Sequence, residues 1–174
     1  MKHILDLSLK LMIVCLAASA GLASVYKLTA ERIKLNARKE VERNLFMVLP
    51  GSNRFEQKEN KFEGFADDQQ IGTAVELAPK GYGGKIKMLA GIDRNGTLIA
   101  IAILSHTETP GLGKNIEMES FKRQFKGKSH KGMFLKKDSP QGEVDAITAA
   151  TISSRAVTDA VRKALQKFNR ENKF

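Results

Sequence analysis

An uncharged apolar run near the N-terminus constrains this chain more than any other feature. Residues 11–26 (LMIVCLAASAGLASVY) carry no charged side chain, and apolar residues continue upstream of Lys10. A helix that crosses a bilayer needs roughly 20 apolar residues. The run and its upstream extension are therefore long enough to span a membrane, and we expect a membrane segment at residues 1–26.

Two interpretations of this segment remain open. A secretory signal peptide needs a basic start, a short apolar run and small residues at its exit, and residues 1–3 and 18–20 supply both ends. An uncleaved anchor is favoured by apolar residues that follow at roughly helical spacing, because they predict one helix that continues to residue 49. These residues are Leu28, Leu35, Val41, Leu45, Val48 and Leu49. We favour the anchor.

The pair Pro50-Gly51 is a strong stop for this helix. We therefore divide the chain into an anchor at 1–26, an amphipathic helical connector at 27–50 and a domain at 51–174. Basic residues are more frequent after the apolar run than before it, and the positive-inside rule would then keep the domain in the cytoplasm. Long domains translocate largely regardless of charge, so charge leaves the side of the membrane open.

Composition excludes several classes of protein. The net charge of +10 favours an anionic partner, but the basic residues are interleaved with acids, tryptophan is absent and there are only two tyrosines. This is a poor stacking platform for nucleic acid, so we expect no nucleic-acid partner. One cysteine and three histidines exclude a disulfide framework, a thiolate zinc site and a cysteine-ligated cluster, and we expect no metal.

The pattern of residues 51–174 predicts an α+β domain, in which helices cover a mostly antiparallel sheet, preceded by the transmembrane helix. Residues 71–78, 85–93 and 97–105 have the composition of strands, and Asn95-Gly96 between the last two favours a tight hairpin. The last of these strands is apolar on both faces, which predicts a central position. Residues 52–70 are polar, and we expect an irregular or partly helical connection there.

Two helices are expected after the last strand. Residues 115–125 carry apolar side chains with charges between them and predict a short helix, and residues 126–142 are basic and loop-like. The last helix is predicted by one apolar stripe, with Ser153 or Ser154 as its N-cap. The stripe consists of Val157, Val161, Ala164, Leu165 and Phe168.

Two loop segments could carry chemistry. Residues 81–84 (GYGG) precede a predicted strand, and glycine permits close approach to a ligand, although a simple turn would have the same composition. Residues 106–113 (HTETPGLG) directly follow a strand, where a rigid scaffold presents functional groups. Leu112 between two glycines would suit contact with an aromatic ring system, and Glu108 and Thr109 are available for hydrogen bonds. A turn between elements is the simpler alternative.

A third segment, residues 145–154 (DAITAATISS), leads into the last predicted helix. A helix N-terminus exposes unpaired N–H groups and a partial positive charge, so a phosphate would fit there. The hydroxyls of Thr148, Thr151, Ser153 and Ser154 are close to it in sequence. An ordinary hydroxyl-rich cap is the alternative.

In combination, GYGG, a strand hairpin, ETPGLG and D-x-x-T-A-A-T-x-S-S resemble the FMN-binding domain of the G subunits of Rnf electron transport complexes, which is shared with the C subunits of sodium-pumping NADH:quinone reductases. The resemblance covers essentially the whole chain. The chain is short, and in length it is more similar to the Rnf subunits than to the longer quinone-reductase subunits. It implies FMN joined through its phosphate to a threonine by a flavin transferase, and the acceptor position corresponds to Thr151.

The family usually has glycine at the position of Ala149. Because alanine disfavours positive φ, we predict a negative φ there.

The resemblance further implies an electron-transfer subunit of an ion-translocating oxidoreductase complex in the inner membrane, with the FMN domain on the periplasmic side and no catalytic acid or base of its own. Its partners would be the other membrane subunits, the membrane and the flavin transferase, for which Asp145 is the expected recognition residue. Predicted contacts of the covalent FMN are Thr151, Thr148, Ala149, Ala150, Ser153, Glu108, Thr109, Gly111, Leu112, Gly113, Tyr82, Gly83 and Gly84. The alternatives are a C subunit of a quinone reductase or another exported flavin carrier and, more remotely, a non-redox membrane-tethered binding module.

Overall fold

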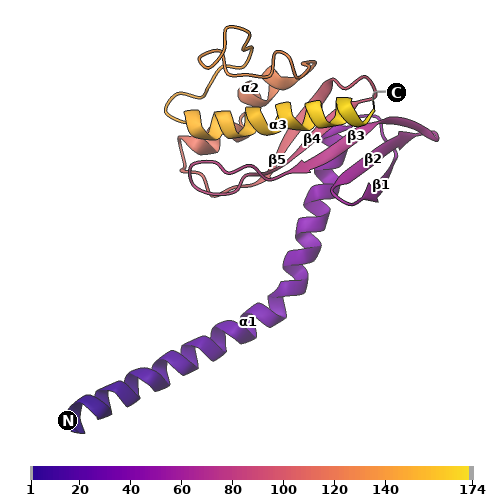
Figure 1. Cartoon of the computed structure of the whole chain (residues 1–174). Helices are drawn as coiled ribbons and strands as arrows, with labels where there is room; N and C mark the ends of the chain where they lie inside the picture. Colours follow the sequence, from indigo (N-terminus) through magenta and orange to yellow (C-terminus); the bar gives the residue numbers. More distant parts are fainter. Residues whose placement is uncertain (1, 173–174) are drawn as a thin grey trace. The chain divides into compact units, whose positions relative to one another are not determined.

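The computed structural model describes residues 2–172 and contains a long helix, one sheet and several shorter helical segments (Figure 1). In chain order the elements are α1 (Lys2–Val48), β1 (Arg54–Lys58), β2 (Lys61–Ala66), β3 (Gln69–Leu77), β4 (Lys87–Asp93), β5 (Leu98–Ser105), η1 (Gly113–Glu117), α2 (Glu119–Lys122), η2 (Arg123–Phe125) and α3 (Thr151–Glu171). Contacts within the chain define two units, one that ends at Glu40 and one that begins at Val41. The α1 helix contributes to both.

The part of α1 before Val41 forms the first unit and is solvent-exposed along most of its length. Within the described residues, α1 is the one helix long and apolar enough to cross a membrane, with a mean hydropathy of 1.8 over 18 residues. A signal sequence near the N-terminus has the same properties, so both interpretations of residues 1–26 stand. The predicted continuation of the helix past the apolar run is confirmed, since α1 is unbroken to Val48.

The five strands form one antiparallel sheet in the order β1-β2-β3-β4-β5. The predicted α+β class with a mostly antiparallel sheet is thus confirmed. The predicted hairpin at Asn95-Gly96 joins β4 to β5. Asp93 Oδ1 accepts hydrogen bonds there from the backbone N–H groups of Asn95 and Thr97, at 2.9 and 2.8 Å. Gly96 has a φ of +76°, a conformation that glycine adopts without steric cost.

Residues 52–70 are not the irregular or partly helical connection that we predicted. They contain β1 and β2, which pair with each other along the whole of β1 around a two-residue turn. In β1 every residue except Phe55 is exposed, so the apolar alternation by which a strand is recognised is missing. Phe55 packs edge-on against Phe46, with 4.9 Å between the ring centroids, and this contact is invisible in the local sequence.

The apolar strand β5 lies at an edge of the sheet, not in the centre as predicted. Its outer edge is covered at one end, where Gly127 N–H donates to Leu98 O and Leu98 N–H donates to Lys128 O. The strand is apolar on both faces because the sheet is covered on both. Ile101 belongs to the apolar cluster beneath α3, and Ala102 belongs to a second cluster that includes the end of α1.

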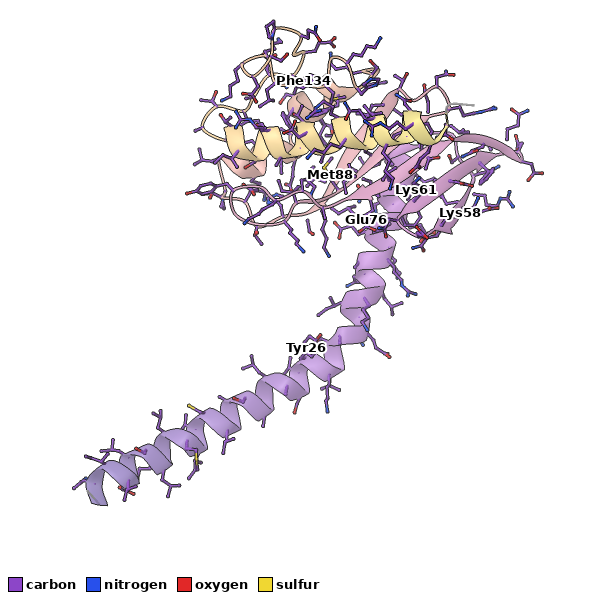
Figure 2. All side chains as sticks on the ribbon, in the orientation of Figure 1. Tyr26, Lys58, Lys61, Glu76, Met88 and Phe134 are labelled. Atoms are coloured by element: carbon purple, nitrogen blue, oxygen red, sulfur yellow. The ribbon has the colours of Figure 1, made fainter. Side chains whose placement is uncertain are left out.

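The larger apolar cluster lies between the sheet and α3, which crosses the sheet in Figure 1. Met88 of β4, labelled in Figure 2, is fully buried in it together with Val157, Val161 and Leu165 of α3. These three α3 residues belong to the stripe that predicted the last helix. Each fully buried side chain of this kind contributes about 1.5–3 kcal/mol, so the stripe fixes α3 on the sheet.

The opposite face of the sheet is covered by the last turns of α1 and by Leu49, which directly follows it. Leu45, Val48 and Leu49 are buried there against Ala74 of β3 and Leu89 of β4. The end of α1 is thus part of the domain core.

Three short helical segments, η1, α2 and η2, replace the single helix predicted at residues 115–125. Met118 between η1 and α2 is extended, with a ψ of 137°, so the helical hydrogen bonding stops there. Of the four apolar residues on which this prediction rested, Ile116, Phe121 and Phe125 are nevertheless buried, whereas Met118 is exposed. The segment therefore packs through three of the four predicted side chains, and its backbone is less regular than a single helix.

Candidate functional site

A cavity of about 420 Å³ lies at the N-terminal end of α3, within the size range of small-molecule sites. Three parts of the sequence form it: the loop before β4, the loop after β5 and the turn that starts α3. The lining residues are Tyr82, Glu108, Thr109, Leu112, Gly113, Ala149, Ala150, Thr151, Ile152 and Ser153. The fold therefore brings together the three segments that the sequence singled out.

Glu108 joins these three parts. Its Oε1 accepts a hydrogen bond from Gly83 N–H at 3.0 Å, and its Oε2 accepts one from Ser153 Oγ at 2.5 Å. Glu108 is only 6% exposed, and a buried carboxylate is costly unless its oxygens are hydrogen-bonded. His106 orients the same loop, because its Nδ1 accepts the N–H of Glu108 at 3.0 Å. Glu108 therefore fixes both loops to α3.

Two glycines allow the close packing around Glu108. A Cβ at Gly83 would lie 2.2 Å from Thr107 O, and a Cβ at Gly113 would lie 2.5 Å from Glu108 Oε2. Both distances are far inside van der Waals contact. Gly83 thus lets the loop before β4 pack against the loop after β5, and Gly113 leaves room for the Glu108 side chain. The side chains of Tyr82 and Leu112 line the cavity.

The turn before α3 shows that one sequence prediction was wrong. Ala149 has a φ of +60°, where we expected a negative value. Ala150 N–H donates to Ile147 O at 3.0 Å, which makes Ala149 the third residue of a four-residue turn, where a type II turn requires positive φ. Alanine in this left-handed conformation costs roughly 1–2 kcal/mol, and nothing in the structure explains its presence in place of glycine.

Ser153 and Ser154 do not provide the N-cap that we predicted. The α3 helix begins at Thr151 with Ala150 as its N-cap residue, so both serines lie in the first turn. Ser154 Oγ donates to Ala150 O at 2.9 Å and accepts from Ile147 N–H at 3.0 Å. Ser154 thus holds the turn before the helix, and Ser153 holds Glu108. The cap prediction failed because the helix begins earlier than expected.

Thr151 is the first residue of α3 and lies in the cavity wall with a half-buried side chain. Its Oγ1 accepts a hydrogen bond from Lys137 Nζ. Asp138, which follows Lys137 in the sequence, forms a bidentate ion pair with Arg155, with N–O distances of 2.6 and 2.7 Å. The hydrogen bond from Arg155 holds the pKa of the Asp138 carboxyl below its usual value.

Sequence reasoning missed four residues of this region. Ile152 lines the cavity, and Lys137, Asp138 and Arg155 form the contacts beside Thr151. Lys137 is separated from Thr151 by 14 positions in a segment without periodicity, so no local pattern links the two. The spacing of four residues between Thr151 and Arg155 is the one signal that could have placed Arg155 on the same helix face.

Five residues predicted to take part in the site lie outside the cavity lining: Gly83, Gly84, Gly111, Thr148 and Asp145. Asp145 is exposed and pairs with Lys136 at 2.7 Å, and its backbone N–H donates to Gln124 Oε1 at 2.7 Å. Asp145 is thus accessible at the surface and anchored through its backbone.

The cavity has the chemistry to hold a flat aromatic ligand that carries a phosphate. Three apolar side chains line it while remaining exposed: Tyr82 at 74%, Ile152 at 51% and Leu112 at 43%. Exposed apolar side chains around a concave site mark binding surfaces. The start of α3 offers N–H groups that have no partner within the helix, which suits a phosphate.

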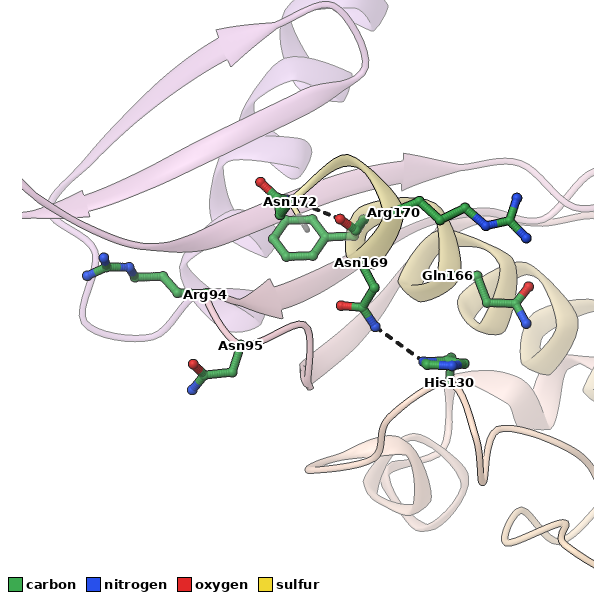
Figure 3. Close-up of a pocket in the computed structure, with 8 residues that line it drawn as sticks. Arg94, Asn95, His130, Gln166, Asn169, Arg170 and Asn172 are labelled. Carbon is green, nitrogen blue, oxygen red and sulfur yellow. Dashed lines mark hydrogen bonds between the residues drawn. The ribbon is translucent and has the colours of Figure 1, made fainter. Parts of the chain in front are cut away.

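A second cavity, of about 520 Å³, lies near the C-terminal end of α3 (Figure 3). Asn169 of α3 is hydrogen-bonded there to His130, with 3.2 Å between Nδ2 and Nδ1. Arg94 and Arg170 also line it, but their side chains extend in opposite directions (Figure 3). At 1.5 Å per residue, Arg170 is about 28 Å along the helix from Thr151, so this cavity is separate from the first.

Residues 81–166 match the family described as FMN-binding domain. This range contains all three segments that form the first cavity. Fold, cavity and family match together define the class of protein: an FMN-binding domain that follows a long N-terminal helix.

Whole-chain relatives define the family more narrowly. The chain is 33% identical over 162 residues to the G subunit of the proton-translocating ferredoxin:NAD(+) oxidoreductase complex of Clostridium ljungdahlii, an alignment that covers 90% of this chain and 87% of the relative. It is also 33% identical over 177 residues to the G subunit of the ion-translocating oxidoreductase complex of Vibrio cholerae, covering 87% and 84%. The chain belongs to the family of G subunits of ion-translocating oxidoreductase complexes.

Solved structures share the fold. The crystal structure of Shewanella oneidensis NqrC superposes with a TM-score of 0.52 at 22% identity, covering 72% of this chain and 71% of that one. The C subunit of the Na(+)-translocating NADH-quinone reductase of Parabacteroides distasonis gives a TM-score of 0.52 at 26% identity, covering 62% and 61%. The predicted kinship with both groups of proteins is confirmed.

Proposed function

We propose that this protein is the electron-transfer subunit of an Rnf-type ion-translocating oxidoreductase complex and carries FMN attached to Thr151 through a phosphoester. The observation that carries the proposal is the position of Thr151. It is the first residue of α3 and lies in the wall of a cavity whose exposed lining includes the large apolar side chains of Leu112 and Ile152 and the ring of Tyr82. A phosphate on Thr151 Oγ1 would sit at the helix N-terminus, with the flavin ring beside Tyr82, Leu112 and Ile152.

When bound, FMN supplies one- and two-electron redox chemistry, and the protein positions the ring and tunes its potential. Glu108 fixes the two loops that present Tyr82 and Leu112. The apolar side chains exclude water from part of the ring. No acid or base from the chain is required, because electrons enter and leave through the ring itself.

Attachment is a phosphoryl transfer from a flavin adenine dinucleotide donor. Thr151 Oγ1 forms a bond to the phosphorus on the flavin side, the bond from that phosphorus to the bridging oxygen breaks, AMP leaves, and the threonine proton is released to a base of the transferase. A threonine hydroxyl is a weak nucleophile at neutral pH. A separate transferase with a metal ion to polarise the pyrophosphate is therefore needed, and the exposed Asp145 is available to it.

We further propose that residues 1–26 are an uncleaved anchor, that the rest of α1 connects it to the FMN domain, whose core already includes the end of this helix, and that this domain faces the periplasm. The apolar helix supports the anchor. A covalent tether supports the periplasmic side, because a flavin lost outside the cytoplasm could not easily be replaced. Protease added to intact spheroplasts should digest the domain. Protection of the domain until the membrane is lysed would place it in the cytoplasm and overturn this assignment.

A second candidate is the C subunit of a sodium-pumping NADH:quinone reductase or another exported flavin carrier, favoured by the fold that the chain shares with the two solved quinone-reductase proteins. Co-purification of the native complex separates the two. Partners of the Rnf type support the first proposal, and partners of the quinone reductase support the second.

The flavin proposal is tested by co-expressing the full chain with a flavin transferase. We expect yellow fluorescence that survives denaturing electrophoresis in the wild type and in Thr148→Ala, and none in Thr151→Ala. Thr148 is the matched control because it is an exposed threonine three positions away. An unlabelled wild type, with the transferase active on a control substrate, would favour the non-redox binding module.

A further inference from the structure

Lys137 occupies an unusual position beside the acceptor threonine. Its Nζ donates a hydrogen bond to Thr151 Oγ1, and an ammonium group has donors but no acceptor. Within residues 2–172, Lys137 takes part in no ion pair, whereas its neighbour Lys136 is neutralised by Asp145 at 2.7 Å. The positive charge of Lys137 contributes to the lowered pKa of the neighbouring Asp138, but Lys137 has no carboxylate within ion-pair distance in the described part of the chain, and its Nζ contacts the threonine oxygen.

The loop that carries Lys137 is held on both sides. At its base, Lys136 N–H donates to Val144 O at 2.9 Å, which closes residues 136–144 into a loop. Two residues after Lys136, Asp138 forms the bidentate ion pair with Arg155. Arg155 lies four residues after Thr151, which places both on the same face of α3. The Asp138–Arg155 pair thus ties the loop to the helix one turn away from the acceptor hydroxyl.

We propose that Lys137 is the counter-ion of the FMN phosphate and that the Asp138–Arg155 pair positions it. The proposal rests on the placement of FMN at Thr151. The phosphodiester formed there keeps one negative charge, and a hydrogen bond between ionised partners is roughly twice as strong as a neutral one. Lys137 already contacts the oxygen that bears the phosphorus after attachment, so it reaches the phosphate without rearrangement of the loop.

The test compares two ligands that differ only in the phosphate. Full-length protein is purified in detergent from a host without flavin transferase, and FMN and riboflavin are titrated against it by fluorescence. Riboflavin affinity reports on the cavity, and the ratio of the two dissociation constants reports on phosphate recognition. The variants are Lys137→Met, Lys137→Arg, Asp138→Asn and, as the matched control, Lys136→Met.

We expect the wild type to prefer FMN over riboflavin by about tenfold or more, as is typical for one charge-assisted contact. Lys137→Met should lose most of this preference with an unchanged riboflavin affinity, and Lys137→Arg should retain it. Asp138→Asn should lose part of it, because the lysine is then held less firmly. Lys136→Met should match the wild type.

The remaining outcomes separate the inference from the function it rests on. If FMN and riboflavin bind and Lys137→Met keeps the wild-type preference, the role of Lys137 is wrong while the flavin site stands. If Lys136→Met loses as much of the preference for FMN as Lys137→Met does, the preference comes from general surface charge, and the inference is also overturned. If neither flavin binds the wild type, the flavin cavity and the role of Lys137 both fail.

Discussion

Ala149 is held in a left-handed conformation, with φ at +60°, and its replacement by glycine should relieve this strain. We expect Ala149→Gly to raise the free energy of unfolding by about 1 kcal/mol. For a chain of this size that corresponds to a rise in Tm of about 2–4 °C, measurable by differential scanning calorimetry. Ala160→Gly in the middle of α3 is the control and should lower stability by about 1 kcal/mol. Equal destabilisation by both changes would contradict the turn geometry.

Glu108 is the residue on which the geometry of the cavity depends most. Glu108→Ala removes the acceptor of both Gly83 N–H and Ser153 Oγ and should cost about 3 kcal/mol, whereas Ser153→Ala removes one of these bonds and should cost about 1.5 kcal/mol. Chemical denaturation of the single and double variants measures these values. Because the two residues share a hydrogen bond, the double variant should be less destabilised than the sum. Strict additivity would show that they do not interact.

The loop of residues 136–144 and helix α3 are joined by a contact that depends on pH. The pKa of Asp138 is lowered from its ordinary value of 3.8 by the hydrogen bond from Arg155, so the folded state favours the carboxylate. The stabilisation is therefore complete above the pKa of the unfolded chain and is lost as the pH falls through the lower folded-state value. The difference in Tm between the wild type and Asp138→Asn should be full at neutral pH and should shrink below about pH 4. A constant difference down to about pH 2 would contradict this linkage.

Elements with a strong apolar period were predictable, and those defined by tertiary contacts were not. The stripe at Val157, Val161 and Leu165 predicted α3, and Asn95-Gly96 predicted the hairpin between β4 and β5. Local sequence determines both. In contrast, β1 has a single partly buried residue, Phe55, and exists through its pairing with β2. The position of β5 at an edge was also not predictable. An edge strand that is covered on both faces is as apolar as a strand in the centre of a sheet.

The candidate site shows the same division. The three segments around the cavity could be chosen from glycine, hydroxyl and turn chemistry, and the fold brings them together. The contacts of Lys137 and Glu108 could not be predicted, since they join residues 14 and 45 positions apart. The conformation of Ala149 was predicted wrongly because the turn around it outweighs the preference of alanine.

At the scale of the whole molecule, the domain begins inside α1. Leu45, Val48 and Leu49 are buried on one face of the sheet, and together they contribute roughly 5–9 kcal/mol, a large share of the 5–15 kcal/mol typical of a whole domain. A fragment of residues 41–174 should therefore unfold cooperatively, and a fragment of residues 52–174 should not. Near-ultraviolet circular dichroism with thermal melting distinguishes them. A cooperative transition of equal midpoint in both would show that the end of α1 is dispensable.

The central claim concerns one oxygen atom, Thr151 Oγ1. The most direct measurement is tandem mass spectrometry of proteolytic peptides from the full chain matured with an active flavin transferase. We predict that the peptide spanning residues 145–155 gains the mass of FMN less one water, and that its fragment ions place the gain on Thr151. Placement on Thr148 or on a serine, or an unmodified peptide while the transferase labels a control substrate, would contradict the account.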